Sequence, residues 1–589
     1  MPTARLAALS SQLQEATGLY VAMKSRPRLA FSPRPHVVID GIVFADHNGA
    51  LVIEADQLYG VLKLLPFLTG RLDLDSLALV RPRARAVLDE KRIEAPGAAA
   101  RAASAPPASA EAQKADSFRL GVLTVVDGSL RVKRAGREYL AEKITASLDW
   151  RKIGDPALLT AGFDWRGEHM QTQFWVARPG ALLRGDVSVA TGRLDAESLR
   201  LEAEGVAQLG ANGRFAGRIA GSATSVREAL QLFSISTPLP GPFGDGQFSA
   251  QATLAPKEAT FKDLKIFVDG NAFDGELTLR LEDGRPNVTA ALHSDFVALK
   301  PMLSDAPALL ASDGQWSREP LDPPDLSGAD VDLRLKADHA RLGRLTVDDA
   351  SVILSLRESV LDLSLVEAQA YRGRLKARAS FKPSDDRLSM HATAQTSAVD
   401  ARALLWDAFG RQALSGALDA SLALDASGAN VAEMMRALNG RASLALSEGE
   451  IAGVDFERAL RRLEKRPLSS AQDIRSGSST LDSAKLTLLL EKGVGAVEDG
   501  SARGPGFALG FEGSANLVER SLSLKAVARE ADGAGKPRDK GLNISFDLTG
   551  GFDELTLAPD PQAFIRRSGA AAPLLPEPPA ADKEQSPPR

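Results

Sequence analysis

The sequence predicts a mostly β, antiparallel fold with a few short helices, and three observations predict it. Apolar and polar side chains alternate with a period of two in many segments, which places the apolar ones on one face of a strand. Helical periodicity is scarce in comparison. Turn signals follow one another at short intervals, so neighbouring strands should form hairpins and meanders. They include Asp127-Gly128, Asp269-Gly270, Asp283-Gly284, Glu448-Gly449 and Asp499-Gly500.

The first 90 residues should combine a short helix with β structure. Leu6, Leu9 and Leu13 fit one helix that ends at Thr17-Gly18. Residues 56–68 fit either a short apolar helix or a strand followed by a turn at Pro66. Both alternatives remain open at this point.

Two segments differ from the rest in composition. Residues 91–117 are rich in Ala, Pro and Ser and have almost no large apolar side chain, so we expect a flexible linker. Residues 569–589 contain repeated Pro and should form a disordered tail. We therefore divide the chain into residues 1–90, the linker 91–117, central β repeats at 118–410, a C-terminal β region at 411–568, and the tail 569–589.

The remaining sequence is dominated by one-sided strands. In the clearest cases Leu or Val alternates with Asp, Ser, Thr, Arg or Lys. These apolar residues are Leu72, Leu74, Leu277, Leu279, Leu281, Val331, Leu333, Leu335, Leu361, Leu363, Leu365, Leu422, Leu424, Leu486, Leu488, Leu522 and Leu524. Short helices should separate some of the strands, at residues 225–233, 400–409, 431–438 and 456–464.

A sheet with one apolar face must have that face covered, and three covers are available: a second sheet, packed helices or a bound apolar ligand. Too few helices are predicted to cover so many strands. Aromatic residues make up only 5% of the chain, which is few for an interdigitated sandwich core. The pattern alone leaves the sandwich and the ligand-covered face both open.

Composition narrows the classes of function. Net charge is −5, with both signs interleaved, so no basic stripe suits nucleic acid. The absence of cysteine excludes disulfides, thiol catalysis and Cys-bound zinc. The six His residues are scattered without metal-ligand spacing, and neither a phosphate-binding loop nor a hydrolase elbow is present, so we expect no metal, no cofactor and no enzymatic activity.

Membrane segments are also not visible in the sequence. Apolar runs are only a few residues long, far short of the about 20 residues that span a bilayer. The first residues, with only Leu6 and Leu9 as large apolar side chains, do not match a signal peptide.

The order of several segments resembles the AsmA family. In the N-terminal part the similarity lies in residues 29–35, 39–45, 55–58, 64–72 and 77–82, and it resumes at residues 123–130. In the C-terminal half it lies in residues 414–418, 434–442, 447–455 and 542–568. The middle, residues 150–320, is only generically similar, and no single motif is sharp.

This resemblance implies an elongated antiparallel repeating β-groove, a curled and twisted sheet with an apolar interior. It further implies a lipid-binding, bridge-like transfer protein of the Gram-negative envelope that supports outer-membrane biogenesis. Phospholipids would be the ligands, with inner-membrane and outer-membrane or periplasmic proteins as partners. The alternative is a non-enzymatic assembly or structural factor for outer-membrane proteins.

The groove interpretation also assigns candidate contact residues and a location. Acyl chains would lie on Leu277, Leu279, Val331, Leu333, Leu335, Leu361, Leu363, Leu365, Leu422, Leu424, Leu486, Leu488, Leu522 and Leu524. Family members carry an N-terminal membrane anchor, whereas this sequence begins with the short helix that follows it. We expect a periplasmic protein that is attached to the inner membrane if an upstream anchor precedes this sequence.

Overall fold

The computed structural model describes residues 19–32, 34–46, 49–63, 74–88, 121–134, 137–152, 154–210, 213–233, 243–282, 285–303, 308–321, 328–384, 386–463, 477–532, 543–552 and 554–559. The expected opening helix, the linker and the C-terminal tail lie outside these residues. The chain forms two compact units, residues 1–293 and 294–589. Each unit is described by itself below.

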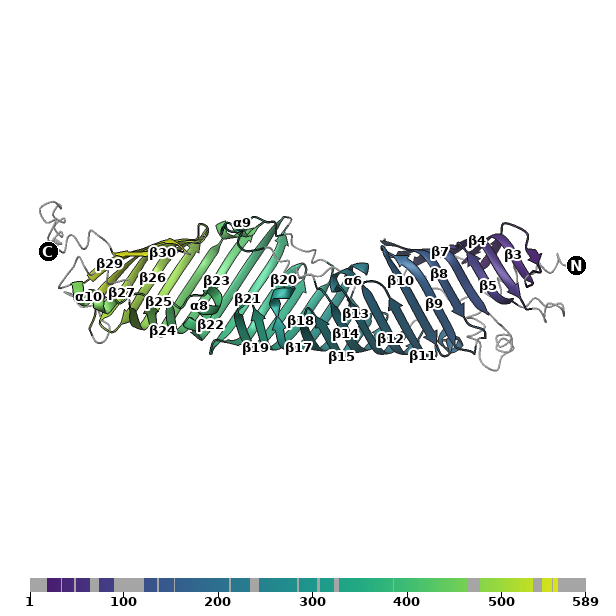
Figure 1. Cartoon of the computed structure of the whole chain (residues 1–589), viewed down its shortest axis with the longest axis horizontal. Coiled ribbons are helices and arrows are strands. Elements are labelled where there is room, and N and C mark those ends of the chain that lie inside the picture. Colours follow the sequence, from purple (N-terminus) through teal and green to yellow (C-terminus); the bar gives the residue numbers. More distant parts are fainter. Residues whose placement is uncertain are drawn as a thin grey trace, which may run out of the picture. The chain divides into compact units, whose positions relative to one another are not determined.

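Unit 1 consists of strands that mostly pair with their neighbours in the chain, as Figure 1 shows. Its elements are β1 (Tyr20–Met23), β2 (Arg28–Ala30), β3 (His36–Ala45), β4 (Leu51–Leu62), β5 (Leu74–Val80), β6 (Arg83–Leu88), β7 (Val122–Arg134), β8 (Arg137–Asp149), β9 (Ala157–Trp165), β10 (Glu168–Val176), α5 (Pro179–Leu183), β11 (Val187–Asp195), β12 (Leu199–Gln208), β13 (Arg214–Ala223), α6 (Val226–Leu232), β14 (Gly246–Ala255), β15 (Glu258–Val268), β16 (Asn271–Glu282) and β17 (Arg285–Ala298), within which the division falls.

From β7 to β17 each strand of unit 1 pairs antiparallel with the next. Strands β5 and β6 form two successive stretches along β4, interrupted at Arg81 and Pro82. Both then pair parallel with β7, which the sequence did not predict. A parallel pair cannot be closed by a tight hairpin, so local turn signals do not predict it.

Unit 2 is an antiparallel meander throughout its described pairs. Its elements are α7 (Leu299–Met302), β18 (Asp330–Leu342), β19 (Leu345–Arg357), β20 (Val360–Ala370), β21 (Gly373–Ser384), β22 (Arg387–Asp400), α8 (Ala401–Phe409), β23 (Leu414–Gly428), α9 (Val431–Arg436), β24 (Asn439–Ala452), α10 (Phe456–Leu463), β25 (Ser478–Glu491), β26 (Val494–Gly504), β27 (Phe507–Asn516), β28 (Ser521–Glu530), β29 (Asn543–Gly551) and β30 (Glu554–Pro559).

The predicted turn signals have two different structural outcomes. Asp269-Gly270 is a two-residue hairpin turn in which both residues have positive φ, as a tight hairpin requires. Asp127-Gly128, Glu448-Gly449 and Asp499-Gly500 instead lie inside strands β7, β24 and β26, so the turns predicted there are wrong. Register shifts near all three mark β-bulges, whose bent backbone favours the same residue types as a turn. Asp283-Gly284 lies outside the described residues.

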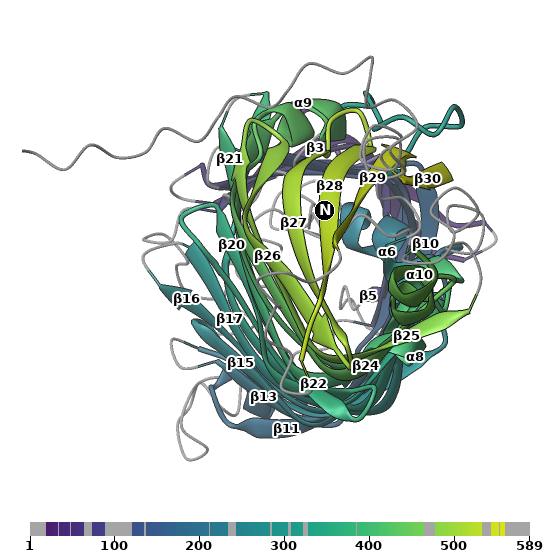
Figure 2. The same ribbon diagram turned by 90° about the vertical axis from the view of Figure 1, so that its left-hand side faces the viewer.

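The strands of each unit are curved, as the end-on view in Figure 2 shows. In this view α6 and α10 lie on the concave side of the strands. Unit 1 has a hydrophobic core at β1, β3, β4 and β5, with Ile39, Ile42 and Leu58 almost fully buried. The core of unit 2 lies under α10, where Phe456 contacts Phe507 and Phe546.

The prediction of a mostly β, antiparallel, groove-like fold with a few short helices is confirmed. Helices α6, α8, α9 and α10 form at the four predicted places. Residues 56–62 belong to strand β4, so of the two alternatives for that segment the strand is correct. No helix in the described part of the chain is both long and apolar enough to cross a membrane.

Candidate functional site

The predicted contact residues of unit 2 all lie on one face of its sheet. Residues directly opposite one another on antiparallel strands point to the same side, so the strand register can be followed from strand to strand. The first pairs join Val331, Leu333 and Leu335 of β18 to Leu356, Leu354 and Val352 of β19, and these to Leu361, Leu363 and Leu365 of β20. We call this side the apolar face of unit 2.

The same face continues to the C-terminal strands. Leu365 pairs with Ala377, Ala377 with Ala394, and Ala394 with Leu422. The pairs that follow carry the face across β24 to β28. They are Leu422 with Ala442, Ala442 with Leu488, Leu444 with Leu486, Leu490 with Gly495, Gly495 with Ala515, Ala515 with Leu522, and Gly513 with Leu524.

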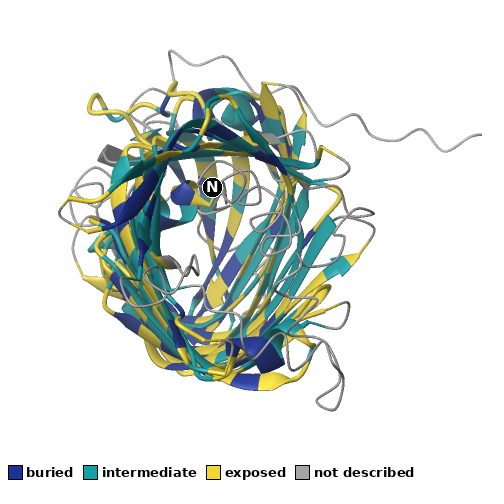
Figure 3. Ribbon diagram, turned by 90° about the vertical axis from the view of Figure 1, so that its right-hand side faces the viewer, coloured by how far each residue is buried: buried dark blue, intermediate teal, exposed yellow. Residues whose placement is uncertain are grey.

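These side chains are neither closed off nor fully exposed. Twelve predicted residues of unit 2, from Val331 to Leu524, are half-buried, and so is Leu277 of unit 1. Leu279 is 37% exposed. Figure 3 shows that half-buried positions recur along many strands. The inner faces of a sandwich would be buried by a second sheet, so the register and the exposure together describe an apolar face that remains partly open.

Unit 1 has an apolar face of the same kind. Leu277 pairs with Phe261 and Leu279 with Ala259, and both continue the alternation of the neighbouring strands. Phe174 lies opposite Gly192, where an added Cβ would be 2.9 Å from the ring. Large rings that lie over glycines keep this face smooth, although the sequence has few aromatic residues.

A second Phe–Gly pair lies further along the apolar face of unit 1. Phe248 of β14 is opposite Gly221 of β13, and a Cβ on Gly221 would collide with the Phe248 ring. Among the contact residues predicted from the sequence, only Leu277 and Leu279 belong to this unit. The other positions are mostly Ala and Gly, and their alternation with polar residues, as in β12, was the signal that could have found them.

Helices cover parts of the apolar face of unit 2. Met434 and Met435 of α9 pack with Leu422, Leu424 and Leu488 around a small buried cluster. Phe456 and Leu460 of α10 close the C-terminal part over fully buried residues such as Phe546. Methionine side chains adapt their shape to irregular surroundings, so α9 is a softer cover than α10.

The opposite side of each sheet carries paired charged residues, both within a strand and between neighbouring strands. In unit 1, Asp195 accepts hydrogen bonds from Arg193 at 2.6 Å and from Arg200 at 2.8 Å. The Arg193 hydrogen bond lowers the pKa of the Asp195 carboxyl, with a smaller contribution from Arg200. Such exposed pairs stabilise a fold little, but they mark this side as the water-facing one.

Three His–Asp pairs also lie on the polar side. His169 contacts Asp164 at 2.8 Å. His339 with Asp348 and His391 with Asp425 each lie at 2.7 Å. Each pair joins two neighbouring strands, and all three imidazoles are exposed. This arrangement is typical of surface ion pairs between strands.

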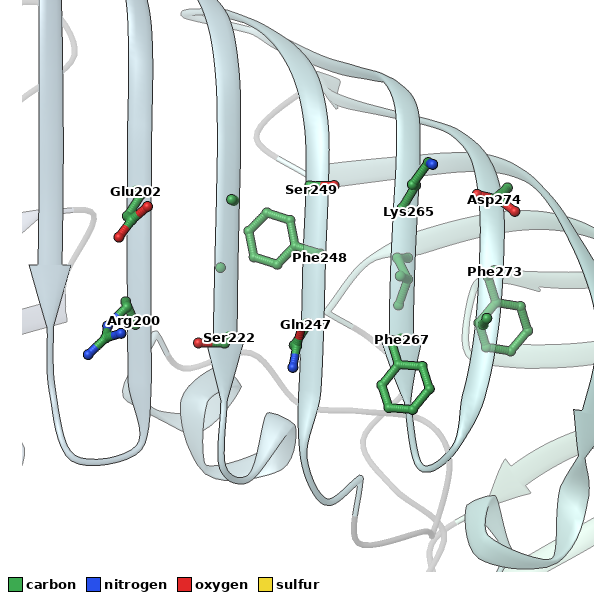
Figure 4. Close-up of a pocket in the computed structure, with 14 residues that line it drawn as sticks. Arg200, Glu202, Ser222, Gln247, Phe248, Ser249, Lys265, Phe267, Phe273 and Asp274 are labelled. Atoms are coloured by element: carbon green, nitrogen blue, oxygen red, sulfur yellow. The ribbon is translucent and has the colours of Figure 1, made fainter.

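A hollow of about 450 Å³ crosses β12 to β16 of unit 1 and is shown in Figure 4. Most of its lining residues alternate to the polar side, including Arg200, Glu202, Lys265 and Asp274. Both signs of charge are therefore present. Gly221 and Phe248 of the apolar face also line the hollow, so both sets of side chains border it.

The aromatic residues of α8 form an exposed surface that the periodicity of the strands does not predict. Trp406 is 48% exposed and Phe409 is 72% exposed, although both are large apolar side chains. The helix itself was predicted, but the side of it that faces the solvent depends on its packing against β18 to β23. Sequence reasoning therefore missed this surface.

Comparison with known proteins gives one positive result. A model of the AsmA family matches residues 180–499, which is more than half of the chain and extends from α5 to β26. The match includes most of the middle region, residues 150–320, in which the sequence showed only a general similarity to the family. Searches of curated proteins and of solved structures found no match. The half-open apolar faces and the repeating antiparallel strands agree with this result, and the chain belongs to the AsmA family.

Proposed function

We propose that this protein binds the acyl chains of phospholipids on its apolar faces and carries them through water between membranes of the cell envelope. Membership of the AsmA family supports a role in envelope and lipid biogenesis. The observation that carries the proposal is the exposure of the apolar face of unit 2. Along that face, Leu and Val side chains stay half-buried on one strand after another.

An open apolar face is costly in water and is relieved by an apolar ligand. Burying each methylene group contributes about 0.8 kcal/mol, so an acyl chain in contact with several strands would gain several kcal/mol. Patches of exposed apolar surface this regular mark binding surfaces in soluble proteins. The acyl chain would lie on Leu and Val while the headgroup stayed in water.

The same face also suits movement of the ligand. Its residues are mainly Leu, Val, Ala and Gly, which offer no fixed polar contact to an acyl chain. Binding would thus be tolerant of chain length and would allow sliding. No chemical step belongs to this function, so we propose a non-enzymatic protein that acts in the periplasm with membrane proteins as partners.

Reversing the polarity of the apolar face tests the proposal. Leu333→Asp combined with Leu363→Asp places two charges on the face where an acyl chain would lie. We expect this variant to lose most of its capacity for a fluorescent phospholipid, because a buried charge next to an acyl chain is strongly disfavoured. Lipid transfer between donor and acceptor vesicles should fall with it.

The matched control lies one residue away. Ile353 is 38% exposed on the polar side of β19, and its neighbour Leu354 is on the apolar face opposite Leu333. Ile353→Asp should leave lipid capacity unchanged. Equal lipid capacity in a folded Leu333→Asp, Leu363→Asp variant and in the wild type would contradict the proposal.

A further inference from the structure

The outward side of α8 carries two large aromatic residues, which a surface helix normally buries. Arg402, Trp406 and Phe409 follow one another at spacings of four and three, so they share one side of the helix, and all three are exposed. A surface helix normally turns its polar residues to water. Here the two aromatic residues of the helix are among its most exposed side chains.

The helix is held firmly at both ends. Asp400 caps its N-terminus by accepting hydrogen bonds from the backbone N–H groups of Arg402 and Ala403, at 3.0 and 3.3 Å. Gly410 ends it with φ of 68°, a conformation that favours glycine, and donates its N–H to the Trp406 carbonyl. The exposed aromatic residues are thus presented by an ordered element.

The side of α8 that faces the sheet is also fixed. Ala401 is fully buried. The Tyr371 hydroxyl donates to the Asp407 carboxylate at 2.9 Å, which joins α8 to the turn between β20 and β21. Burial and Asp407 together raise the pKa of Tyr371, so this hydroxyl remains a donor at neutral pH. Asp407 therefore has a partner within the protein.

Arginines lie beside the exposed aromatic residues, although Arg402 also pairs with Glu450 of β24 at 3.7 Å. The Arg344 guanidinium lies 6.0 Å from the centre of the Trp406 ring. Leu342, 43% exposed, lies in the same β18–β19 hairpin. The three adjoining segments, residues 341–344, 371–374 and 401–411, contain six arginines and a single acidic residue, Asp407. We call the set Leu342, Arg344, Arg402, Trp406 and Phe409 the α8 patch.

We propose that the α8 patch is a docking surface for an anionic phospholipid bilayer. Trp and Phe favour the boundary between headgroups and acyl chains, where an amphipathic helix lies in the plane of the membrane. Arginines beside them attract anionic headgroups near the membrane surface. This contact is separate from acyl-chain binding on the apolar faces, and it would bring unit 2 to the membrane from which lipid is taken or to which it is given.

Vesicle co-sedimentation of the full chain tests the docking. Phosphatidylcholine vesicles with added phosphatidylglycerol should bind the protein, and pure phosphatidylcholine vesicles should bind it more weakly. Trp406→Ser with Phe409→Ser should reduce binding to the anionic vesicles about tenfold or more, since two interfacial anchors are lost. Arg344→Glu should weaken binding to the anionic vesicles and leave binding to neutral ones unchanged.

The control variant removes exposed apolar residues elsewhere. Val189 and Val206 are opposite one another on the polar side of unit 1 and are both exposed. Val189→Ser with Val206→Ser should bind anionic vesicles as the wild type does. If the α8 variant also binds them as the wild type does, or if neither protein binds vesicles, the α8 patch does not dock on a bilayer.

Fluorescence quenching gives a second and independent readout. Trp406 should be quenched by lipids brominated near the headgroup, and Trp406→Phe should remove that quenching while retaining vesicle binding. Quenching that is unchanged in Trp406→Phe would overturn the proposal. The Trp406→Ser, Phe409→Ser variant should still load a fluorescent phospholipid in solution, so failure of docking and failure of acyl-chain binding can be told apart.

Discussion

On the polar side, a single cross-strand pair can shift the pKa of a side chain, and His339 is an example. Its Nδ1 atom lies 2.7 Å from an Asp348 carboxylate oxygen. That hydrogen bond raises the pKa of His339 above 6.5, and the nearby Asp338 and Asp349 act in the same direction. Because the pKa is raised in the folded state, the pair stabilises the fold below the unfolded His pKa, and this contribution is lost as pH rises through the folded value.

We therefore expect an NMR titration of the His339 imidazole to have its midpoint above 6.5. Asp348→Asn should lower that midpoint, since the amide carries no charge. Asp425→Asn, at the separate His391–Asp425 pair, is the matched control and should leave the His339 midpoint unchanged. An identical His339 midpoint in the wild type and Asp348→Asn would disprove the assigned cause.

Truncation of a side chain buried under α10 should destabilise the fold much more than truncation of an exposed one. Phe546 is 0% exposed and contacts Phe456 at 5.6 Å between ring centres. Phe546→Ala should lower the free energy of unfolding of unit 2 by about 3–5 kcal/mol, because it leaves a cavity in a closed core. Leu489→Ala, on the exposed polar side of β25, should cost under about 1 kcal/mol. Chemical denaturation measures both, and equal losses would contradict this distinction.

At the scale of elements, sequence reasoning found most of what local chemistry determines. Alternation located strands such as β18 and β20, and the short helix predicted at residues 400–409 is α8. The sequence did not distinguish the three bulges from turns, because both structures favour residues that tolerate a positive φ or a local bend. The parallel pairing of β5 and β6 with β7 joins parts of the chain that are distant in sequence, and local periodicity does not predict such a pairing.

The Asp400 cap gives a prediction for α8 as an element. Asp400→Ala removes the acceptor of two backbone N–H groups and should destabilise the helix by about 1 kcal/mol. Hydrogen exchange of the α8 amides should accelerate, and binding to anionic vesicles should weaken. Asp400→Asn is the matched control, since Asn caps helices about as well as Asp. Equal α8 exchange rates in the Ala and Asn variants would refute the role of the cap.

For the whole molecule, the sequence predicted the family and the antiparallel β class, and both are confirmed. The fourteen predicted contact residues lie on the apolar faces of their units by register, but whether lipid contacts them stays a prediction. Their partial exposure could not be predicted, because the pattern of a face does not reveal what covers it. The division into two units at residue 293 likewise follows from packing and carries no composition signal.

The central claim is that the apolar faces are open to acyl chains. Its most direct test is extraction of the natively purified chain followed by lipid mass spectrometry, with an unrelated β sandwich taken through the same preparation. We expect several phospholipids per chain, and few or none with the sandwich. A lipid-free, monodisperse chain would contradict the claim, because the apolar faces would then be stable in water without a ligand.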